Sequence, residues 1–329
     1  MTTYKGINGF AVQSVASDPS PLDEGQVWYN NATYAFKLAG IQAAAWASGG
    51  NMGTTRTAIG SAGTQTAGLG FGGSDGVTFG LTSTEEYNGT SWSPGGNLNT
   101  GRYYPTGVGT QTAALSFGGS FFPPFILQTS TELYNGTSWT ASGAMPTGRR
   151  LMGGSGIQTA ALGFGGQGPP DAVAPDINTT ISFNGSSWTS VPATLNTTRS
   201  GLRGAGTQTA ALAFGGNPTT AATESYNGTS WTNVNSLNTA RTDLAGSGTE
   251  TLALAFGGAT PSSTGATETW NGTSWTNSTS MTTARNGLGG SPAGTQTAAL
   301  AFGGFGPPYS NATEEFTGIT VATKTITTS

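Results

Sequence analysis

Few charged side chains in this sequence could do chemistry, and most of them recur at fixed places. An arginine opens each of six similar segments, and in five of these a glutamate stands two residues before an aromatic residue, whereas Ile181 takes its place in the other. Such arginines could bind anions, but groups repeated identically usually serve what the repeats share. We therefore expect structural ion pairs between Arg56, Arg102, Arg149, Arg199, Arg241 and Arg285 and Glu85, Glu132, Glu224, Glu268 and Glu314.

The remaining chemistry-bearing residues do not favour catalysis. Histidine and cysteine are absent, and these are the residues most used as general bases, nucleophiles and zinc ligands. No two of the other titratable residues form a recognisable catalytic pair. We expect a protein that is not an enzyme and that has no cofactor and no metal site. The alternatives are an all-oxygen calcium site near Asp171 and Asp176 and, least favoured, a carbohydrate-active enzyme.

Net charge and hydropathy exclude further classes. The 329 residues carry a net charge of −4, and only 8% are charged. This balance does not favour nucleic-acid binding, which requires a basic face. No stretch has the apolar length of a membrane span, and the N-terminal MTTYKGINGF lacks the apolar core of a signal peptide. We expect no membrane insertion and no export by a signal peptide.

An alternating apolar run that ends in a glycine pair returns six times and must position these residues. Its phenylalanines are separated by 46, 47, 50, 42 and 46 residues, a period typical of repeats that each fold as one small antiparallel sheet. They are Phe71, Phe117, Phe164, Phe214, Phe256 and Phe302.

One repeat, residues 199–237, shows how such a unit folds. SGLRGAG, TAALAFGG, TESY and SWTNV each predict a strand, and Asn227-Gly228 predicts a hairpin turn of type I′. Four short strands repeated around an axis form a β-propeller. We expect an all-β fold with six four-stranded blades, in which a strand at Trp46 helps to close the ring. Seven blades, with residues 26–50 as one more, is the alternative.

The order of diglycine, aromatic residue, tryptophan and blade-opening arginine resembles the kelch repeat over roughly residues 50–325. In the sixth unit Phe316 is followed by Val321 where a tryptophan is expected, which suggests altered closure. The aromatic residue and the tryptophan stay in register in the other five, as Tyr87/Trp92, Tyr134/Trp139, Phe183/Trp188, Tyr226/Trp231 and Trp270/Trp275.

Alternation of strand direction sorts the connections onto two faces. The turns between strands one and two and between strands three and four are nearly invariant, whereas the loops between strands two and three vary in length and content. Aromatic residues and prolines gather in these variable loops, where they either anchor a contact surface or pack against the blades. The predicted binding face contains Phe79, Phe121, Phe122, Phe125, Asp171, Asp176, Phe305 and Tyr309.

The first forty residues differ from the repeats, so we expect a domain boundary there, with the propeller over residues 41–329. Residues 1–24 are expected to form an extended arm, and residues 26–38 a hairpin. This leader followed by kelch-like repeats is similar to virion structural proteins of tailed phages, especially marine and cyanobacterial ones. The resemblance implies docking on other virion proteins through residues 1–38, with Tyr4, Phe10, Trp28 and Tyr29 as candidates.

The resemblance implies a phage virion protein that assembles in the host cytoplasm and forms a homo-oligomer in the particle. Together with the variable loops, it predicts a tail appendage or fibre-like component whose propeller serves host attachment, through a surface glycan or an envelope protein. The alternative is a capsid decoration or a neck protein that uses the propeller as a packing interface.

Overall fold

The computed structural model describes residues 3–5, 11–171 and 173–326, and no helix is found among them. The chain forms two compact units. One, the N-terminal unit, combines residues 1–44 with 318–329, and the other, the propeller unit, spans residues 45–317. The sequence placed residues 318–329 in the propeller, so that boundary differs from the prediction.

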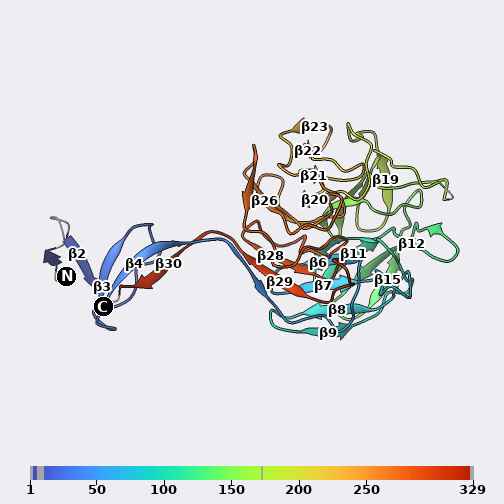
Figure 1. The fold of residues 1–329 in the computed structure, drawn as a ribbon. Helices are drawn as coiled ribbons and strands as arrows, with labels where there is room; N and C mark the ends of the chain where they lie inside the picture. Colours follow the sequence, from blue (N-terminus) through green and yellow to red (C-terminus); the bar gives the residue numbers. More distant parts are fainter. Residues whose placement is uncertain (1–2, 6–10, 172, 327–329) are drawn as a thin grey trace. The chain divides into compact units, whose positions relative to one another are not determined.

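Six antiparallel sheets form the blades of the propeller unit, as predicted. Figure 1 shows β20 to β23 and β6 to β9 each running in chain order from the middle of the unit to its edge. The first blade comprises β6 (Gly60–Gly63), β7 (Gly68–Phe71), β8 (Thr84–Tyr87) and β9 (Trp92–Gly95), and the second comprises β10 (Thr106–Thr110), β11 (Ala113–Phe117), β14 (Thr131–Tyr134) and β15 (Trp139–Ser142). The third blade comprises β16 (Gly153–Ile157), β17 (Ala160–Phe164), β18 (Thr180–Phe183) and β19 (Trp188–Val191), and the fourth comprises β20 (Arg203–Gly206), β21 (Ala211–Phe214), β22 (Thr223–Tyr226) and β23 (Trp231–Val234). The fifth blade comprises β24 (Ala245–Gly248), β25 (Ala253–Phe256), β26 (Thr267–Trp270) and β27 (Trp275–Ser278).

The sixth blade takes its outer strand from the other end of the propeller unit. Its strands are β28 (Ala298–Phe302), β29 (Thr313–Thr317) and β5 (Ala45–Ser48). Trp46 pairs with Phe316 in the register in which Trp139 pairs with Tyr134 in the second blade. The strand at Trp46 therefore completes the sixth blade, and the prediction of six blades rather than seven is confirmed.

The inner strand of the sixth blade is reduced to two isolated bridges, between Gly289 and Phe302 and between Thr295 and Ala298, so this blade has three strands rather than the predicted four. Its sequence is longer here than in the other repeats and contains Pro292. Proline has no amide hydrogen for a ladder bond, and the amide of Ala293 instead donates to Gly63 in the first blade.

Each outer-strand tryptophan joins its blade to the preceding one. Its ring packs against the diglycine-run phenylalanine of that blade, with centroids 4.7 to 5.2 Å apart. Its indole nitrogen donates a hydrogen bond to the threonine that begins the third strand of that preceding blade. These bonds close a circle of Trp46–Thr267, Trp92–Thr313, Trp139–Thr84, Trp188–Thr131, Trp231–Thr180 and Trp275–Thr223.

A glutamine in the turn between strands one and two forms a second connection between blades. Gln111, for example, donates from Nε2 to the carbonyl oxygens of Gly68 and Tyr87 in the preceding blade. Gln65, Gln158, Gln208 and Gln296 do the same in theirs. The near-invariance of this turn is thus explained by packing between blades.

The predicted hairpins between strands three and four are present, but their turns are not of type I′. Tyr226 pairs with Trp231, which leaves a four-residue loop. Within it only Gly228 has a positive φ, and the Asn227 side chain accepts amide hydrogens from Thr229 and Ser230. The asparagine thus acts through its side chain rather than through a left-handed backbone.

The N-terminal unit is a five-stranded sheet in the order β1, β2, β3, β4, β30. The predicted hairpin is present, but the predicted extended arm contains two strands, and β2 pairs in parallel with β3. The C-terminal β30 pairs with β4 in the register in which β29 pairs with β5. The bounds are β1 (Thr3–Lys5), β2 (Ala11–Val15), β3 (Val27–Asn30), β4 (Ala35–Gln42) and β30 (Thr320–Thr325).

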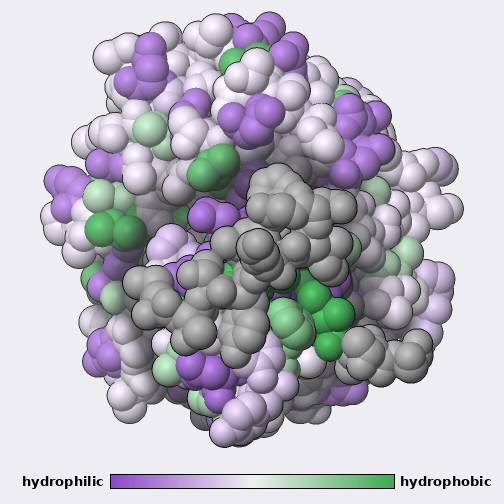
Figure 2. All heavy atoms as spheres, turned by 90° about the vertical axis from the view of Figure 1, so that its left-hand side faces the viewer, coloured by the Kyte–Doolittle hydropathy of each residue, from purple (hydrophilic) through white to green (hydrophobic). Residues whose placement is uncertain are grey.

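The molecular surface is polar although few residues are charged. On the face shown in Figure 2, hydrophobic residues lie in small separate groups among hydrophilic and intermediate ones. Threonine, serine and asparagine on the outer strands and turns supply this polarity. Among the described residues, none belongs to a helix long and apolar enough to span a membrane.

Candidate functional site

The repeated charges form buried ion pairs within single blades, as predicted. The five arginine–glutamate pairs have nitrogen–oxygen distances of 2.5 to 3.0 Å, and the arginine side chains are fully buried. Each glutamate also accepts backbone amides, as Glu224 does from Asn196 and Thr197. In five of the six blades such a pair connects the third strand to the segment that leads into the blade, and these arginines are closed to any ligand.

Arg149 stands alone in the third blade, where Ile181 replaces the glutamate. Its guanidinium instead donates to the Thr147 hydroxyl at 3.2 Å and to the Thr179 carbonyl at 3.3 Å. Burial lowers the pKa of Arg149, since desolvation disfavours its charge.

A ring of strained backbone surrounds the propeller axis. The residue two places after each blade-opening arginine has φ between 53° and 59°, although only two of the six are glycine. Five backbone hydrogen bonds of 2.7 to 3.1 Å connect these positions from blade to blade. A left-handed conformation costs other residues roughly 1–2 kcal/mol each, so the ring is held by the surrounding fold. Its members are Ala58, Tyr104, Leu151, Gly201, Asp243 and Gly287.

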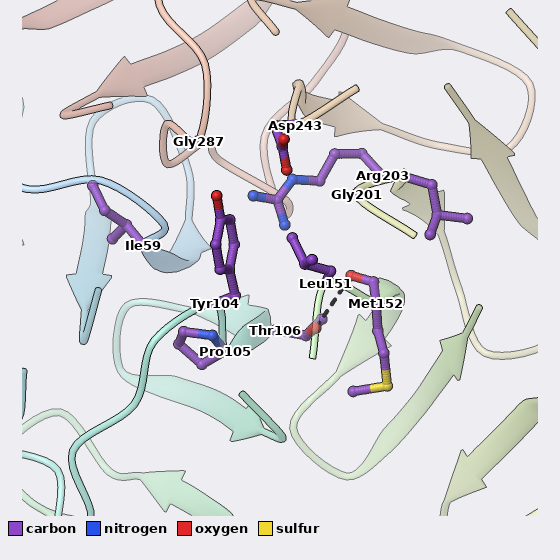
Figure 3. Close-up of a pocket in the computed structure, with 11 residues that line it drawn as sticks. Ile59, Tyr104, Pro105, Thr106, Leu151, Met152, Gly201, Arg203, Asp243 and Gly287 are labelled. Atoms are coloured by element: carbon purple, nitrogen blue, oxygen red, sulfur yellow. Dashed lines mark hydrogen bonds between the residues drawn. The ribbon is translucent and has the colours of Figure 1, made fainter. Parts of the chain in front are cut away.

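Charged side chains meet inside this ring. Figure 3 shows the Arg203 guanidinium between the Asp243 carboxylate and the Tyr104 ring. Arg203 donates from Nε to the carbonyl oxygen of Leu244 at 2.7 Å and from Nη2 to that of Leu288 at 3.4 Å. It thereby crosses to the next two blades and separates two small cavities. The residues at the equivalent position in neighbouring blades are small, such as Gly153 and Ala245. A long charged side chain at this position is therefore particular to the fourth blade.

Burial raises the pKa of Asp243 to about 6, although Arg203 and Arg150 oppose the shift. In the unfolded chain the pKa of this aspartate has its ordinary value near 3.8. The folded protein therefore binds the proton of the Asp243 carboxyl group more tightly than the unfolded chain does. The stability that this proton provides is fully present below about pH 4 and is lost as the pH rises through 6.

Asp243→Asn is expected to remove this dependence, because asparagine is neutral at every pH and tolerates a left-handed backbone. Urea unfolding at pH 4 and pH 7 measures the effect. Between these pH values the wild type should lose on the order of 2 kcal/mol relative to the variant. Asp23→Asn, at an exposed position, is the control and should follow the wild type. Parallel stability curves for wild type and Asp243→Asn would contradict the prediction.

The variable-loop face carries an aromatic groove, defined by Phe79, Tyr103, Ser120, Phe122, Phe125 and Arg150. Its open volume is about 390 Å³, within the range of small-molecule sites. Phe79 packs edge-to-face on Tyr103, with centroids 5.4 Å apart, and on Phe122, at 5.8 Å. Three of the predicted binding residues thus meet in one concavity.

Arg150 supplies the charge of the aromatic groove. Its guanidinium carbon lies 4.5 Å from the centroid of the Phe125 ring, in cation–π range. Its Nε donates to Gln167 Oε1 at 2.9 Å, and Gln167 donates in turn to Asp176 at 3.3 Å. Asn217 donates to the other oxygen of Asp176 at 3.1 Å. Asp176, predicted as a binding residue, thus lies behind the groove and orients Gln167.

The other predicted loop residues lie outside the groove. Phe121 belongs to β12 (Ser120–Phe121), which pairs with β13 (Ile126–Leu127), and its ring lies beside Gly80. Asp171 lies in the turn after Pro170. Phe305 packs on Tyr309, with centroids 5.3 Å apart, and the Tyr309 ring lies against Gly76 of the first blade.

Tyr103 and Arg150 were not predicted as binding residues, because they lie outside the loops between strands two and three from which the binding face was predicted. The available signal was the variation at the position directly after each blade-opening arginine: Thr57, Tyr103, Arg150, Ser200, Thr242 and Asn286.

The docking residues of the N-terminal unit need one correction. Trp28 is fully buried, and its indole donates to Asp18 at 3.0 Å, so it is not available for docking. Asn30 and Lys37 also donate to Asp18, and these three bonds lower the pKa of Asp18 to about 2. Tyr4 lies in β1, but its side chain is not described, and Phe10 lies outside the described residues.

The opposite side of this sheet carries a group of partly exposed apolar side chains, with Ser14 and Lys324 beside them. Tyr29 and Phe36 are in ring contact, with centroids 5.0 Å apart, and share their side with Val27 and Leu38. Ile326 follows on the same side, since its amide donates to the carbonyl of Phe36. Val27, Phe36 and Ile326 are 39%, 45% and 46% exposed. We call this set the open sheet face.

No model of a protein family matches the chain, and no curated protein shows significant similarity to it. Among the described residues there is no group of three or more side chains suited to hold a metal ion.

Proposed function

We propose that this chain is a non-enzymatic structural protein of a tailed-phage virion, a tail appendage that presents its propeller to the host surface. The observation that carries the proposal is the aromatic groove on the variable-loop face. An open concavity of aromatic rings with one cation is suited to binding, since aromatic residues and arginine dominate the energetics of contact surfaces.

The attachment of the chain agrees with outward display of that face. Thr317 at the end of β29 pairs with Ala45 at the start of β5, where the other blades have their turn between strands three and four. The chain therefore enters and leaves the propeller at the invariant-turn face. The variable loops lie on the opposite face of the propeller, free to vary in sequence.

The open sheet face supports docking through the N-terminal unit. Exposed apolar groups on one side of a small sheet favour burial against another surface. We propose that other virion proteins, or further copies of this chain, cover the open sheet face in the particle.

Cryo-electron microscopy of particles of the phage that encodes this chain tests the proposal. We expect the chain at the tail, with the N-terminal unit ordered against neighbouring proteins and the variable-loop face turned to solvent. Variable loops buried against neighbouring subunits would instead identify an assembly protein, and absence of the chain from the particles would refute any virion role.

A further inference from the structure

We propose that the aromatic groove is the subsite for a sugar ring that carries a carboxylate, and that Arg150 recognises the carboxylate. This inference rests on the proposed function, because it names the class of host-surface ligand.

The charge in the groove is unbalanced. Among the described residues, Nη1 and Nη2 of Arg150 have no hydrogen-bond or ion-pair partner, since only Nε is engaged, by Gln167. No acidic residue lines the groove. Asp176 is connected to Arg150 only through Gln167, and its carboxylate already accepts hydrogen bonds from Gln167 and Asn217. Arg150 lines the groove, and its two Nη groups remain available in the fork geometry that matches a carboxylate.

The guanidinium is also held in place before any ligand binds. The ring of Phe125 lies on one side of it, and the hydrogen-bonded chain through Gln167 and Asp176 fixes its Nε. Such preorganisation lowers the entropy lost on binding. Burial lowers the pKa of Arg150, but arginine remains charged at physiological pH. Asp243 acts on Arg150 through a longer-range charge interaction only, and a partly desolvated cation with no carboxylate in direct contact favours an anionic ligand.

The walls of the groove favour a ring as the carrier of this anion. The ring of Phe79 contacts the rings of Tyr103 and Phe122, and all three residues line the cavity. The C–H face of a sugar can stack on such surface. The groove is compact and is lined by side chains of only six residues. An extended peptide would instead require a long groove or a free strand edge.

Binding of the full-length protein to acidic and neutral oligosaccharides tests the inference. Isothermal titration with an oligouronate, the same oligosaccharide after carboxyl reduction, and a sulfated neutral oligosaccharide distinguishes the ligand classes. We expect the oligouronate to bind at least tenfold more tightly than its reduced form. Equal affinity for the two, or a preference for the sulfated sugar, would overturn the assignment.

Variants locate the site. Arg150→Gln should weaken oligouronate binding about tenfold or more, since charged hydrogen bonds are lost. Phe122→Ser should weaken the acidic and the reduced sugar alike. Phe121→Ser is the matched control, because Phe121 is 40% exposed in the same loop but does not line the groove. Circular dichroism confirms folding. Unchanged binding by both Arg150→Gln and Phe122→Ser would refute the subsite.

Binding to host cells separates this inference from the proposed function. If the wild type binds cells and Phe122→Ser does not, while no oligouronate binds, the acidic-sugar assignment fails and the appendage role stands. Loss of cell binding after protease treatment, but not after glycan removal, would likewise show a protein receptor and refute the sugar. If oligouronate binds but particles lack the chain, the virion role fails and the subsite stands.

Discussion

Replacement of Trp46 with alanine is expected to lower the free energy of unfolding of the propeller by about 3–5 kcal/mol, the usual cost of truncating a buried tryptophan. Trp46 is 9% exposed and packs on Phe256 and Phe316, with centroids 5.1 Å from each. Its indole donates to Thr267 at 3.1 Å. These contacts hold β5 on the sixth blade and the sixth blade on the fifth.

Hydrogen exchange distinguishes loss of closure from loss of packing alone. In Trp46→Ala we expect the amides of β29 to lose protection, because β5 covers their outer edge and has no hairpin connection to β29. Trp188→Ala is the matched control. It loses similar contacts with Phe117 and Phe183, but its strand stays attached through a four-residue turn. Equal local protection of the two blades in the two variants would contradict a closing role for Trp46.

Removal of one partner of a buried ion pair is expected to have an effect of similar size. Arg199 and Glu224 are both fully buried, 3.0 Å apart. Arg199→Met leaves the Glu224 carboxylate buried without its cation, which typically costs about 3–5 kcal/mol. The double variant Arg199→Met/Glu224→Leu should lose much less, since no uncompensated charge remains.

The third blade supplies the control for this prediction. Arg149 has no carboxylate partner, because Ile181 occupies that position and is fully buried. Arg149→Met therefore leaves no buried anion and should destabilise the protein less than Arg199→Met does. Urea unfolding of the wild type and the three variants measures the differences. If Arg149→Met and Arg199→Met cost the same, or if the single and double variants in the fourth blade are equal, charge pairing is not the cause.

The repeat period and the alternation of apolar residues were sufficient to predict the fold of the propeller unit. Alternating residues such as Leu212 and Phe214 predict a strand locally, and the 42 to 50 residue period predicts one small sheet per unit. The arginine–glutamate pairing was also accessible, because only structural groups must recur in every blade. The prediction of an extended arm was wrong over Ala11–Val15, which forms β2. This short strand pairs in parallel with β3, and a parallel pair has no hairpin turn that the sequence could reveal.

The aromatic groove was predicted only in part. Loop variability pointed to Phe79, Phe122 and Phe125, but Phe121 lies outside although it is adjacent to Phe122. Successive residues of a short strand face opposite sides, so in β12 Ser120 lines the groove and Phe121 does not, whereas Phe122 begins the turn after this strand. Tyr103 and Arg150 join the groove from connections that precede two different blades, and nothing local in the sequence indicates that juxtaposition.

The sequence by itself determined the all-β class, the six-fold repeat, the buried ion pairs and the identity of the closing tryptophan. These are properties of period and pattern, which each repeat carries locally. Only the tertiary structure decided that β30 pairs with β4, that Trp28 is buried under Asp18, that Arg203 and Asp243 meet at the axis, and that Arg150 faces the aromatic groove. Each of these depends on segments distant in sequence, whose approach is set by closure of the ring and by pairing of the two ends of the chain.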